Sequence, residues 1–147
     1  MSRPILLVED SSDDVFFMRQ AMEKAAITNP FYVVHDGQKA IEFLEKAISR
    51  TDSTVPVPCL VLLDLRLPRM PGLDVLSWIR HHEELKTVPV LILTASKDDK
   101  DIESAYRIGA NSYFVKPSNT NTLLEIVKLI KEYWLKHCMP PPVCVQV

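Results

Sequence analysis

Short apolar runs alternate five times with segments of helical periodicity, and this alternation constrains the fold of the 147-residue chain more than any other feature. The apolar runs occupy residues 4–8, 31–35, 59–63, 88–93 and 112–115. Helical segments follow at 15–25, 40–48, 73–79, between 98 and 109, and at 122–135. Strands that are apolar throughout are typical of parallel sheets covered by helices. We therefore expect an α/β fold: a doubly wound, five-stranded parallel sheet with strand order 2-1-3-4-5 and right-handed crossovers.

The chain has the length of one domain, which we place at residues 1–137. A Pro-rich tail at 138–147 follows, and we expect no output domain after it. The net charge of -2 gives no general reason to expect nucleic acid or an acidic membrane as a partner. No apolar run is long enough to span a bilayer, and the N-terminus lacks a signal-peptide pattern. We expect a cytoplasmic protein that binds neither nucleic acid nor membrane.

The cysteines and histidines show no spacing that is typical of a metal site. The three cysteines are Cys59, Cys138 and Cys144. An odd number of cysteines without a CxxC pair argues against a disulfide framework and against zinc. Cys59 lies in an apolar run, which favours a buried side chain. The four histidines, which we interpret as structural or solvated, are His35, His81, His82 and His137.

Polar side chains stand at the ends of four of the apolar runs. Glu9 and Asp10 follow the first run, Asp64 follows the third, and Thr94 and Lys116 follow the fourth and fifth. Alone, each is more often a turn residue, a helix cap or a solvated charge. Together they are informative, because the carboxyl ends of parallel strands meet at one edge of the sheet. The pattern predicts one site at this edge.

The charges at this edge predict a divalent cation. One pair of carboxylates about 4 Å apart costs on the order of 4 kcal/mol at an effective dielectric constant near 20. Glu9, Asp10 and Asp64 would therefore repel one another unless a cation and Lys116 compensate them. Carboxylate oxygens with room for water suit Mg²⁺ better than zinc or copper. The backbone carbonyl of Arg66 is a candidate for a further ligand.

Such a cluster fits phosphoryl transfer to a carboxylate. We expect Asp64 to act as the nucleophile and to form an acyl phosphate, while the cation neutralises charge on the phosphoryl oxygens. The hydroxyl of Thr94 and the ammonium of Lys116 can contact the remaining oxygens. Ala95 is small and leaves access to this space.

These motifs resemble the response-regulator receiver domain of bacterial two-component signalling, over about residues 4–135. The resemblance rests on Val8-Glu9-Asp10, Leu63-Asp64-Leu65-Arg66-Leu67-Pro68-Arg69-Met70-Pro71-Gly72, Leu93-Thr94-Ala95 and Phe114-Val115-Lys116-Pro117. It implies the flavodoxin-like (CheY-like) form of the fold. The roles that it implies are phosphoacceptor for Asp64, metal-associated acids for Glu9 and Asp10, switch hydroxyl for Thr94, phosphate contact for Lys116 and switch aromatic for Tyr113. It also implies a cis peptide between Lys116 and Pro117.

The resemblance further implies a phosphorelay in which a sensor histidine kinase transfers a phosphoryl group to Asp64. The opening Val-Glu-Asp, the long loop before residue 59 and the ending Glu132-Tyr133-Trp134-Leu135 resemble stand-alone regulators paired with phytochrome-type kinases. Such a protein catalyses only its own phosphorylation and dephosphorylation. Its signal would leave through the face formed by the fourth helix, the fifth strand and the fifth helix. That face, with Trp134 and the tail, suggests a homodimer, and the downstream protein partner is unknown.

The residues argue against three other classes of protein. A dehalogenase-type phosphatase needs a second acid two positions after its nucleophile, where this chain has Arg66. A flavodoxin has an unacidic phosphate loop after its first strand. A nucleotide-binding fold needs a glycine-rich loop, and the three glycines here are far apart. One alternative stays open: a docking module that keeps the fold and works without phosphorylation.

Overall fold

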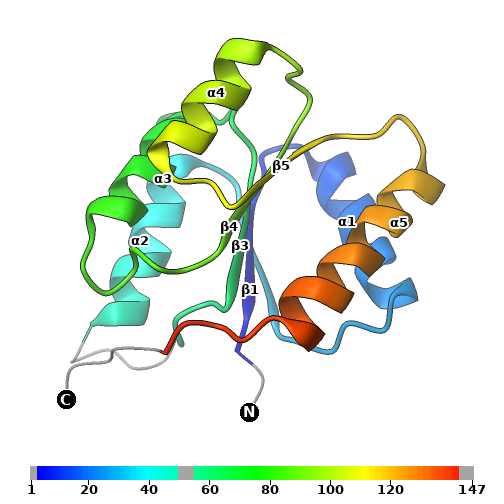
Figure 1. The fold of residues 1–147 in the computed structure, drawn as a ribbon, viewed down its shortest axis with the longest axis horizontal. Coiled ribbons are helices and arrows are strands. Elements are labelled where there is room, and N and C mark those ends of the chain that lie inside the picture. Colours follow the sequence, from blue (N-terminus) through cyan, green and yellow to red (C-terminus); the bar gives the residue numbers. More distant parts are fainter. Residues whose placement is uncertain (1–2, 50–54, 143–147) are drawn as a thin grey trace.

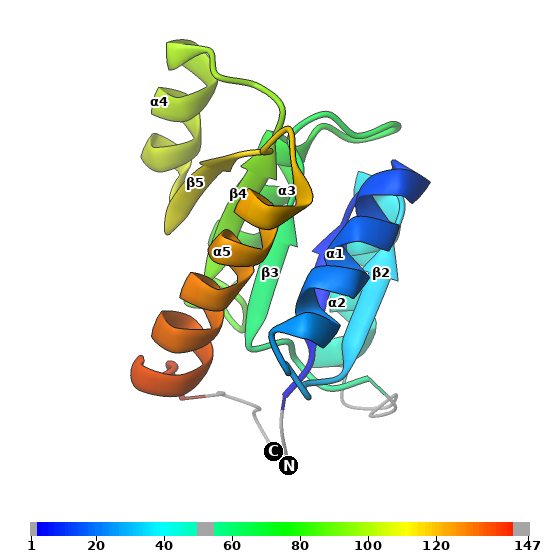
Figure 2. The same ribbon diagram turned by 90° about the vertical axis from the view of Figure 1, so that its right-hand side faces the viewer.

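The computed structural model, which describes residues 3–49 and 55–142, is a five-stranded parallel sheet with helices on both faces (Figure 1). The strands are β1 (Ile5–Val8), β2 (Phe31–Val34), β3 (Leu60–Leu63), β4 (Val90–Thr94) and β5 (Ser112–Val115). The helices are α1 (Ser12–Lys24), α2 (Gly37–Ile48), α3 (Gly72–His81), α4 (Asp99–Ile108) and α5 (Thr120–Ile130), followed by the π-helical segment η1 (Lys131–His137). The strand order is β2-β1-β3-β4-β5, as predicted (Figure 2).

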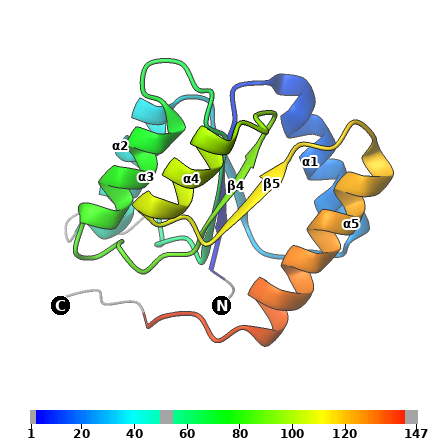
Figure 3. The same cartoon turned by 45° about the horizontal axis from the view of Figure 1, so that its top comes forward.

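Both faces of the sheet are buried, which explains why its strands are apolar throughout. Leu6 and Val8 pack in the core on the side of α2, α3 and α4, whereas Ile5 and Leu7 pack on the side of α1 and α5. Figure 3 shows these two groups of helices on opposite sides of the strands. Successive side chains of a strand point to opposite faces, so the central strands β1 and β3 need an apolar residue at every position.

Backbone hydrogen bonds bring the ends of distant strands together at one edge. Val8 pairs with Leu63, and the next amide along β3, that of Asp64, donates to the carbonyl of Val8 over 3.1 Å. Between β5 and β4, the amide of Lys116 donates to the carbonyl of Thr94 over 2.7 Å. The register therefore carries the predicted polar residues to the same edge.

Several element boundaries differ from those that the sequence predicts. β4 begins at Val90, because the amide of Val88 instead closes a turn onto the carbonyl of Leu85. α5 begins earlier, since the side chain of Asn119 accepts a hydrogen bond from the amide of Thr122 and caps the helix. After Ile130 the predicted single α-helix widens into η1. Helix α4 ends at Ile108, and Gly109 terminates it as predicted, with φ of 127°, a conformation that glycine adopts without strain.

Some predictions concern the ends and the long loop of the chain. Residues 50–54 of the predicted loop, and residues 143–147 of the predicted tail with Cys144, lie outside the described residues. Cys59 is partly exposed and, like Cys138, carries a free thiol. The domain boundary after residue 137 stays a prediction. Among the helices of residues 3–49 and 55–142, none combines the length and apolar character that crossing a membrane requires.

Candidate functional site

Three acidic side chains meet where β1 and β3 end. Glu9, Asp10 and Asp64 each place one carboxylate oxygen within 4.8 Å of the others. Glu9 and Asp64 are buried, and Asp10 is exposed. The arrangement follows from the strand order, because β1 and β3 are neighbours at the point where the winding of the sheet reverses.

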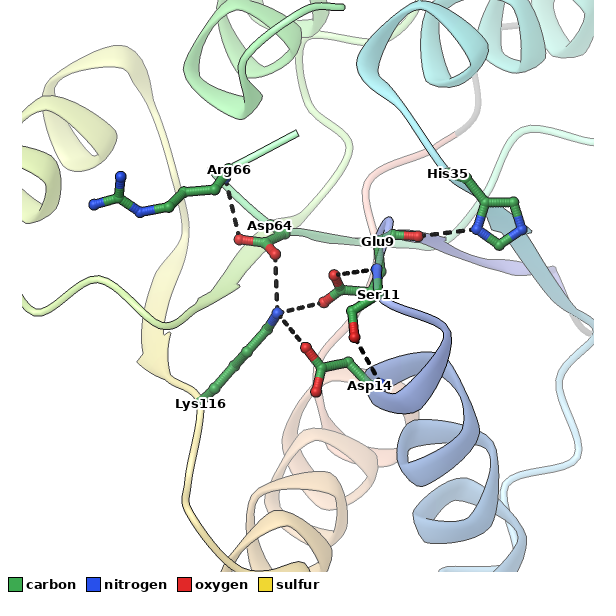
Figure 4. A network of polar contacts seen from close by, with 7 residues as sticks. All are labelled: Glu9, Ser11, Asp14, His35, Asp64, Arg66 and Lys116. Carbon is green, nitrogen blue, oxygen red and sulfur yellow. Dashed lines mark hydrogen bonds and ion pairs between the residues drawn. The ribbon is translucent and has the colours of Figure 1, made fainter. Parts of the chain in front are cut away.

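The loop between β3 and α3 holds the Asp64 carboxylate in place. The amide of Arg66 donates to Asp64 Oδ1 over 3.2 Å, while the side chain of Arg66 points away from the pocket (Figure 4). At the end of this loop, Gly72 packs against the backbone of Asp64. A Cβ atom at Gly72 would lie 2.2 Å from the Asp64 carbonyl oxygen, so only glycine fits there. The start of α3 thus braces the residue that carries the carboxylate.

Lys116 connects the acids across the pocket. Its Nζ atom lies 2.6 Å from Glu9 Oε1, 2.9 Å from Asp64 Oδ2 and 2.7 Å from Asp14 Oδ2 (Figure 4). The first two partners are residues that the sequence places at this edge. Asp14, in the first turn of α1, is one that the sequence did not single out. The Lys116–Pro117 peptide, expected to be cis, is trans, as are the other peptides of the described residues; trans is the lower-energy form of an X–Pro bond.

Burial and neighbouring charges shift the pKa values of Glu9, Asp64 and Lys116 in different directions. Burial raises the pKa of Glu9 from its ordinary 4.5 to about 7, against the opposing effect of Lys116. Burial would also raise the pKa of Asp64, but the hydrogen bond and charge of Lys116, with smaller effects of Thr94 and the Arg66 amide, together outweigh it and hold that pKa below its ordinary value. The pKa of Lys116 is raised, because its acidic partners overcome the effect of burial. Asp64 is therefore ionised at neutral pH and available as a nucleophile.

Thr94 ends β4 with its side chain buried and its hydroxyl unsatisfied. The residue is 0% exposed, and Thr94 Oγ1 has no hydrogen-bond partner among the described residues. The hydroxyl is near enough to Asp64 to help lower the pKa of that carboxyl, although the two groups do not form a hydrogen bond of regular geometry. A buried polar group without a partner costs about 1–3 kcal/mol. A ligand with acceptor oxygens above Asp64 would supply the missing partner.

Tyr113 reaches from β5 to the loop after β4. Its hydroxyl donates to the backbone carbonyl of Ser96 over 2.9 Å, and burial raises its pKa. The Ser96 hydroxyl in turn donates to the carboxylate of Asp101 in α4. Asp101 also lies 3.8 Å from the guanidinium of Arg66. The aromatic ring of Tyr113, to which the family resemblance gives a switch role, is thus tied to the segment joining the pocket and α4.

The contacts that Asp14 and His35 make at the site were not predicted from the sequence. Asp14 lies in the first turn of α1, where a carboxylate is favoured by the helix dipole, and this ordinary role hides its contact with Lys116. His35, interpreted as structural or solvated, places Nδ1 3.1 Å from the backbone carbonyl of Glu9 and supports the turn after β1. No signal in the sequence separates these residues from ordinary caps and turn residues.

The donor set fits a hard divalent cation. Glu9, Asp10 and Asp64 offer carboxylate oxygens at mutual distances that one ion can bridge. In this structure the ammonium of Lys116 supplies the positive charge that compensates two of them. The carbonyl of Arg66 as a further ligand stays a prediction.

The fold and the acidic pocket define a class: flavodoxin-like signalling domains whose site lies at the switch point of the sheet. Within that class, the chain belongs to the response regulator receiver domain family, which matches residues 5–128. This membership confirms the family and the fold that the sequence predicts. The acidic pocket fits Mg²⁺ and a phosphorylation site.

Named relatives agree with this assignment. The probable methanogenesis regulatory protein FilR2 of Methanothrix harundinacea is 40% identical over 131 residues, which cover 89% of this chain and 83% of that protein. Response regulator Rcp1 of Synechocystis sp. is 35% identical over 132 residues, covering 90% and 88%. The phosphorylated cyanobacterial phytochrome response regulator RcpA superposes with a TM-score of 0.88 at 32% identity, covering 97% of this chain and 100% of that one. A Mn²⁺-bound form of Rcp1 superposes with a TM-score of 0.85 at 33% identity, covering 95% and 99%.

Proposed function

We propose that Asp64 accepts a phosphoryl group from a sensor histidine kinase, and that this event is the signal the protein transmits. The observation that carries the proposal is the environment of Asp64. Its carboxylate is buried, held ionised by Lys116, and flanked by the oxygens of Glu9 and Asp10. A buried hydroxyl without a partner, that of Thr94, lies nearby.

The transfer would proceed by attack of an Asp64 oxygen on the phosphorus of a phosphohistidine. The new O–P bond forms as the P–N bond breaks, and the imidazole leaves with the electron pair and takes up a proton. The product is an acyl phosphate on Asp64. Lys116 and Thr94 would donate hydrogen bonds to the phosphoryl oxygens and so stabilise the charge that builds up on them.

Glu9, Asp10 and Asp64 would hold Mg²⁺, with the Arg66 carbonyl as a further ligand. The ion, when bound, neutralises charge on the phosphoryl group during transfer. We favour Mg²⁺ over other ions because the three acidic residues offer oxygen ligands, which suit Mg²⁺.

The protein would act as a signal carrier and catalyse no reaction beyond its own phosphorylation and dephosphorylation. Arg66 stands two positions after Asp64, where a phosphatase with an aspartyl nucleophile has an acid. A bound phosphoryl group would draw the Thr94 hydroxyl toward it and alter the loop that Tyr113 contacts at Ser96. The face of α4, β5 and α5 would then change.

The kinase we favour is of the phytochrome type, because RcpA is a phytochrome response regulator and resembles this chain along almost all of its length. We also propose that the α4–β5–α5 face forms a homodimer and that a further protein, of unknown identity, reads the phosphorylated state. The setting proposed is the cytoplasm, where free thiols such as those of Cys59 and Cys138 persist. We propose that the protein binds neither nucleic acid nor a membrane.

Acetyl phosphate with Mg²⁺ tests the function without knowledge of the kinase. Intact-protein mass spectrometry should show one added phosphoryl group on the wild type and on Asp99→Asn, a control on the exposed start of α4. Asp64→Asn should gain none. A wild type that takes no phosphoryl group from any small donor or kinase would favour the docking module that works without phosphorylation.

A further inference from the structure

The ammonium of Lys116 and a divalent cation share two carboxylate groups, those of Glu9 and Asp64. All three N–H bonds of the ammonium have partners here, namely Glu9, Asp14 and Asp64 at 2.6, 2.7 and 2.9 Å. Glu9 and Asp64 are also members of the acidic cluster that fits a cation. Occupation of that cluster would take two partners from Lys116 and place a like charge beside it.

Asp14 is the partner that remains. It is not a member of the acidic cluster, and it comes from a different segment, the first turn of α1. The backbone at this position is fixed, since the amide of Asp14 donates to the side chain of Ser11, the N-cap of the helix. The Asp14 side chain is 41% exposed, so it keeps part of its hydration while holding the buried ammonium.

We propose that Asp14 is a positioning residue for Lys116: it holds the ammonium beside the pocket when a cation occupies Glu9 and Asp64. The inference rests on the proposed function, because it takes the cation site as given. Without the Asp14 charge, Lys116 depends on the two carboxylates that the cation needs, and the cation must displace it at greater cost. Asp14 thus favours cation binding through Lys116, beyond the simple attraction of one more negative charge.

A double-mutant cycle separates these two effects, with Mg²⁺ affinity measured by calorimetry in the absence of any phosphodonor. Asp14→Asn keeps the shape and an acceptor oxygen but removes the charge. In the presence of Lys116 it should weaken Mg²⁺ binding about tenfold. In a Lys116→Met background the same change should weaken binding less than about twofold. Asp13→Asn, which removes an exposed charge from the same helical turn, should also have less than about a twofold effect.

Equal weakening by Asp14→Asn in both backgrounds would overturn the proposal, because Asp14 would then act only as a charge. Lys116→Gln replaces Lys116→Met in the cycle if the latter does not fold. A structure of the wild type with Mg²⁺ gives an independent answer. Lys116 Nζ should stay within hydrogen-bonding distance of Asp14 after it has separated from Asp64, and a Lys116 that stays on Asp64 and leaves Asp14 would contradict the role. A wild type that binds no divalent cation would instead contradict the metal site of the proposed function.

Discussion

The side-chain ammonium of Lys116 lies 2.9 Å from Oδ2 of Asp64, and the two residues are 52 positions apart in the chain. The contact joins the end of β5 to the end of β3 across β4. It also decides the chemistry of the pocket, because it keeps a buried carboxylate ionised. A carboxylate in that state is both a metal ligand and a nucleophile.

Removing this ammonium should destabilise the metal-free protein. Lys116→Met leaves Glu9 and Asp64 buried without a counter-charge, and we expect the free energy of unfolding at pH 7 to fall by about 2–4 kcal/mol. The lowered pKa of Asp64 contributes stability that is present above the pKa of the unfolded chain and lost as the pH falls. The difference between variant and wild type should therefore shrink in acid.

Urea unfolding at neutral and acidic pH, without divalent ions, measures this difference. Lys39→Met is the matched control, since Lys39 pairs with Glu42 on the surface of α2 and should change stability by less than about 0.5 kcal/mol. A Lys116→Met protein as stable as the wild type at neutral pH would show that the buried acids need no counter-charge.

Mg²⁺ binding should depend on pH through Glu9. Its pKa of about 7 means that a proton must leave before a cation can bind, so affinity should rise about tenfold between about pH 6 and about pH 8. In the metal-free protein the sign for stability is the reverse: the raised pKa makes the contribution of Glu9 complete below its unfolded pKa, and this contribution is lost as the pH rises through about 7.

Calorimetric titration with Mg²⁺ at several pH values measures the first effect. Glu9→Gln cannot titrate at this position and should bind more weakly with a flatter pH profile. An unchanged slope in Glu9→Gln would assign the proton to another group.

Arg80 should be among the more important polar residues for stability. From α3 its guanidinium donates to the carbonyl of Gly109 over 2.8 Å, to that of Val88 over 2.8 Å and to the side chain of Asn111 over 2.9 Å. Arg80→Met removes these bonds and should lower the free energy of unfolding by about 2–4 kcal/mol. Arg107→Met, which removes only an exposed pair with Glu103, should cost less than about 0.5 kcal/mol in the same chemical denaturation experiment. Similar losses in the two variants would mean that this clamp contributes little.

The α4–β5–α5 face supports the proposed homodimer with exposed apolar side chains. Tyr106 of α4 is 49% exposed, Leu129 of α5 is 64% exposed and Tyr133 of η1 is 59% exposed. Trp134, which the sequence assigns to this interface, packs partly against the core instead, with its ring centroid 4.9 Å from that of Tyr133. Burial of such side chains between two copies would favour association.

Light scattering should find a dimer that Leu129→Glu converts to a monomer. Phe16→Glu, at an equally apolar and exposed position of α1, should leave the dimer intact. A wild type that is monomeric with and without a phosphorylation mimic would remove the homodimer from the account.

The sequence predicts most of this fold because the three central strands, β1, β3 and β4, are buried on both faces. Runs such as residues 60–63 admit no polar residue, so they stand out against the amphipathic helices. The edge strands β2 and β5 are only partly buried, and they were recognisable because their short runs are rich in aromatic and β-branched residues. The change from α5 to η1 was not predictable, because residues 131–137 have the composition of an ordinary helix.

The site was predictable only where a residue type is unusual for its position. A buried carboxylate such as Asp64 after an apolar strand requires compensation, and this requirement leads to Lys116. Asp14 carries no such signal, since an acid at the start of a helix is ordinary. The isomer of the Lys116–Pro117 bond came from family resemblance and was wrong, because the residues themselves favour neither form strongly.

The most direct test of the account is to locate the phosphoryl group on the chain. After phosphorylation with Mg²⁺ and a small donor, reduction of the acyl phosphate with borohydride converts the modified aspartate to homoserine, which tandem mass spectrometry identifies by position. We predict homoserine in place of Asp64 and at no other aspartate, with Asp10 and Asp14 as the neighbouring acids to compare. Homoserine at either of those positions, or an unmodified Asp64 in a phosphorylated protein, would show that Asp64 is not the phosphoacceptor.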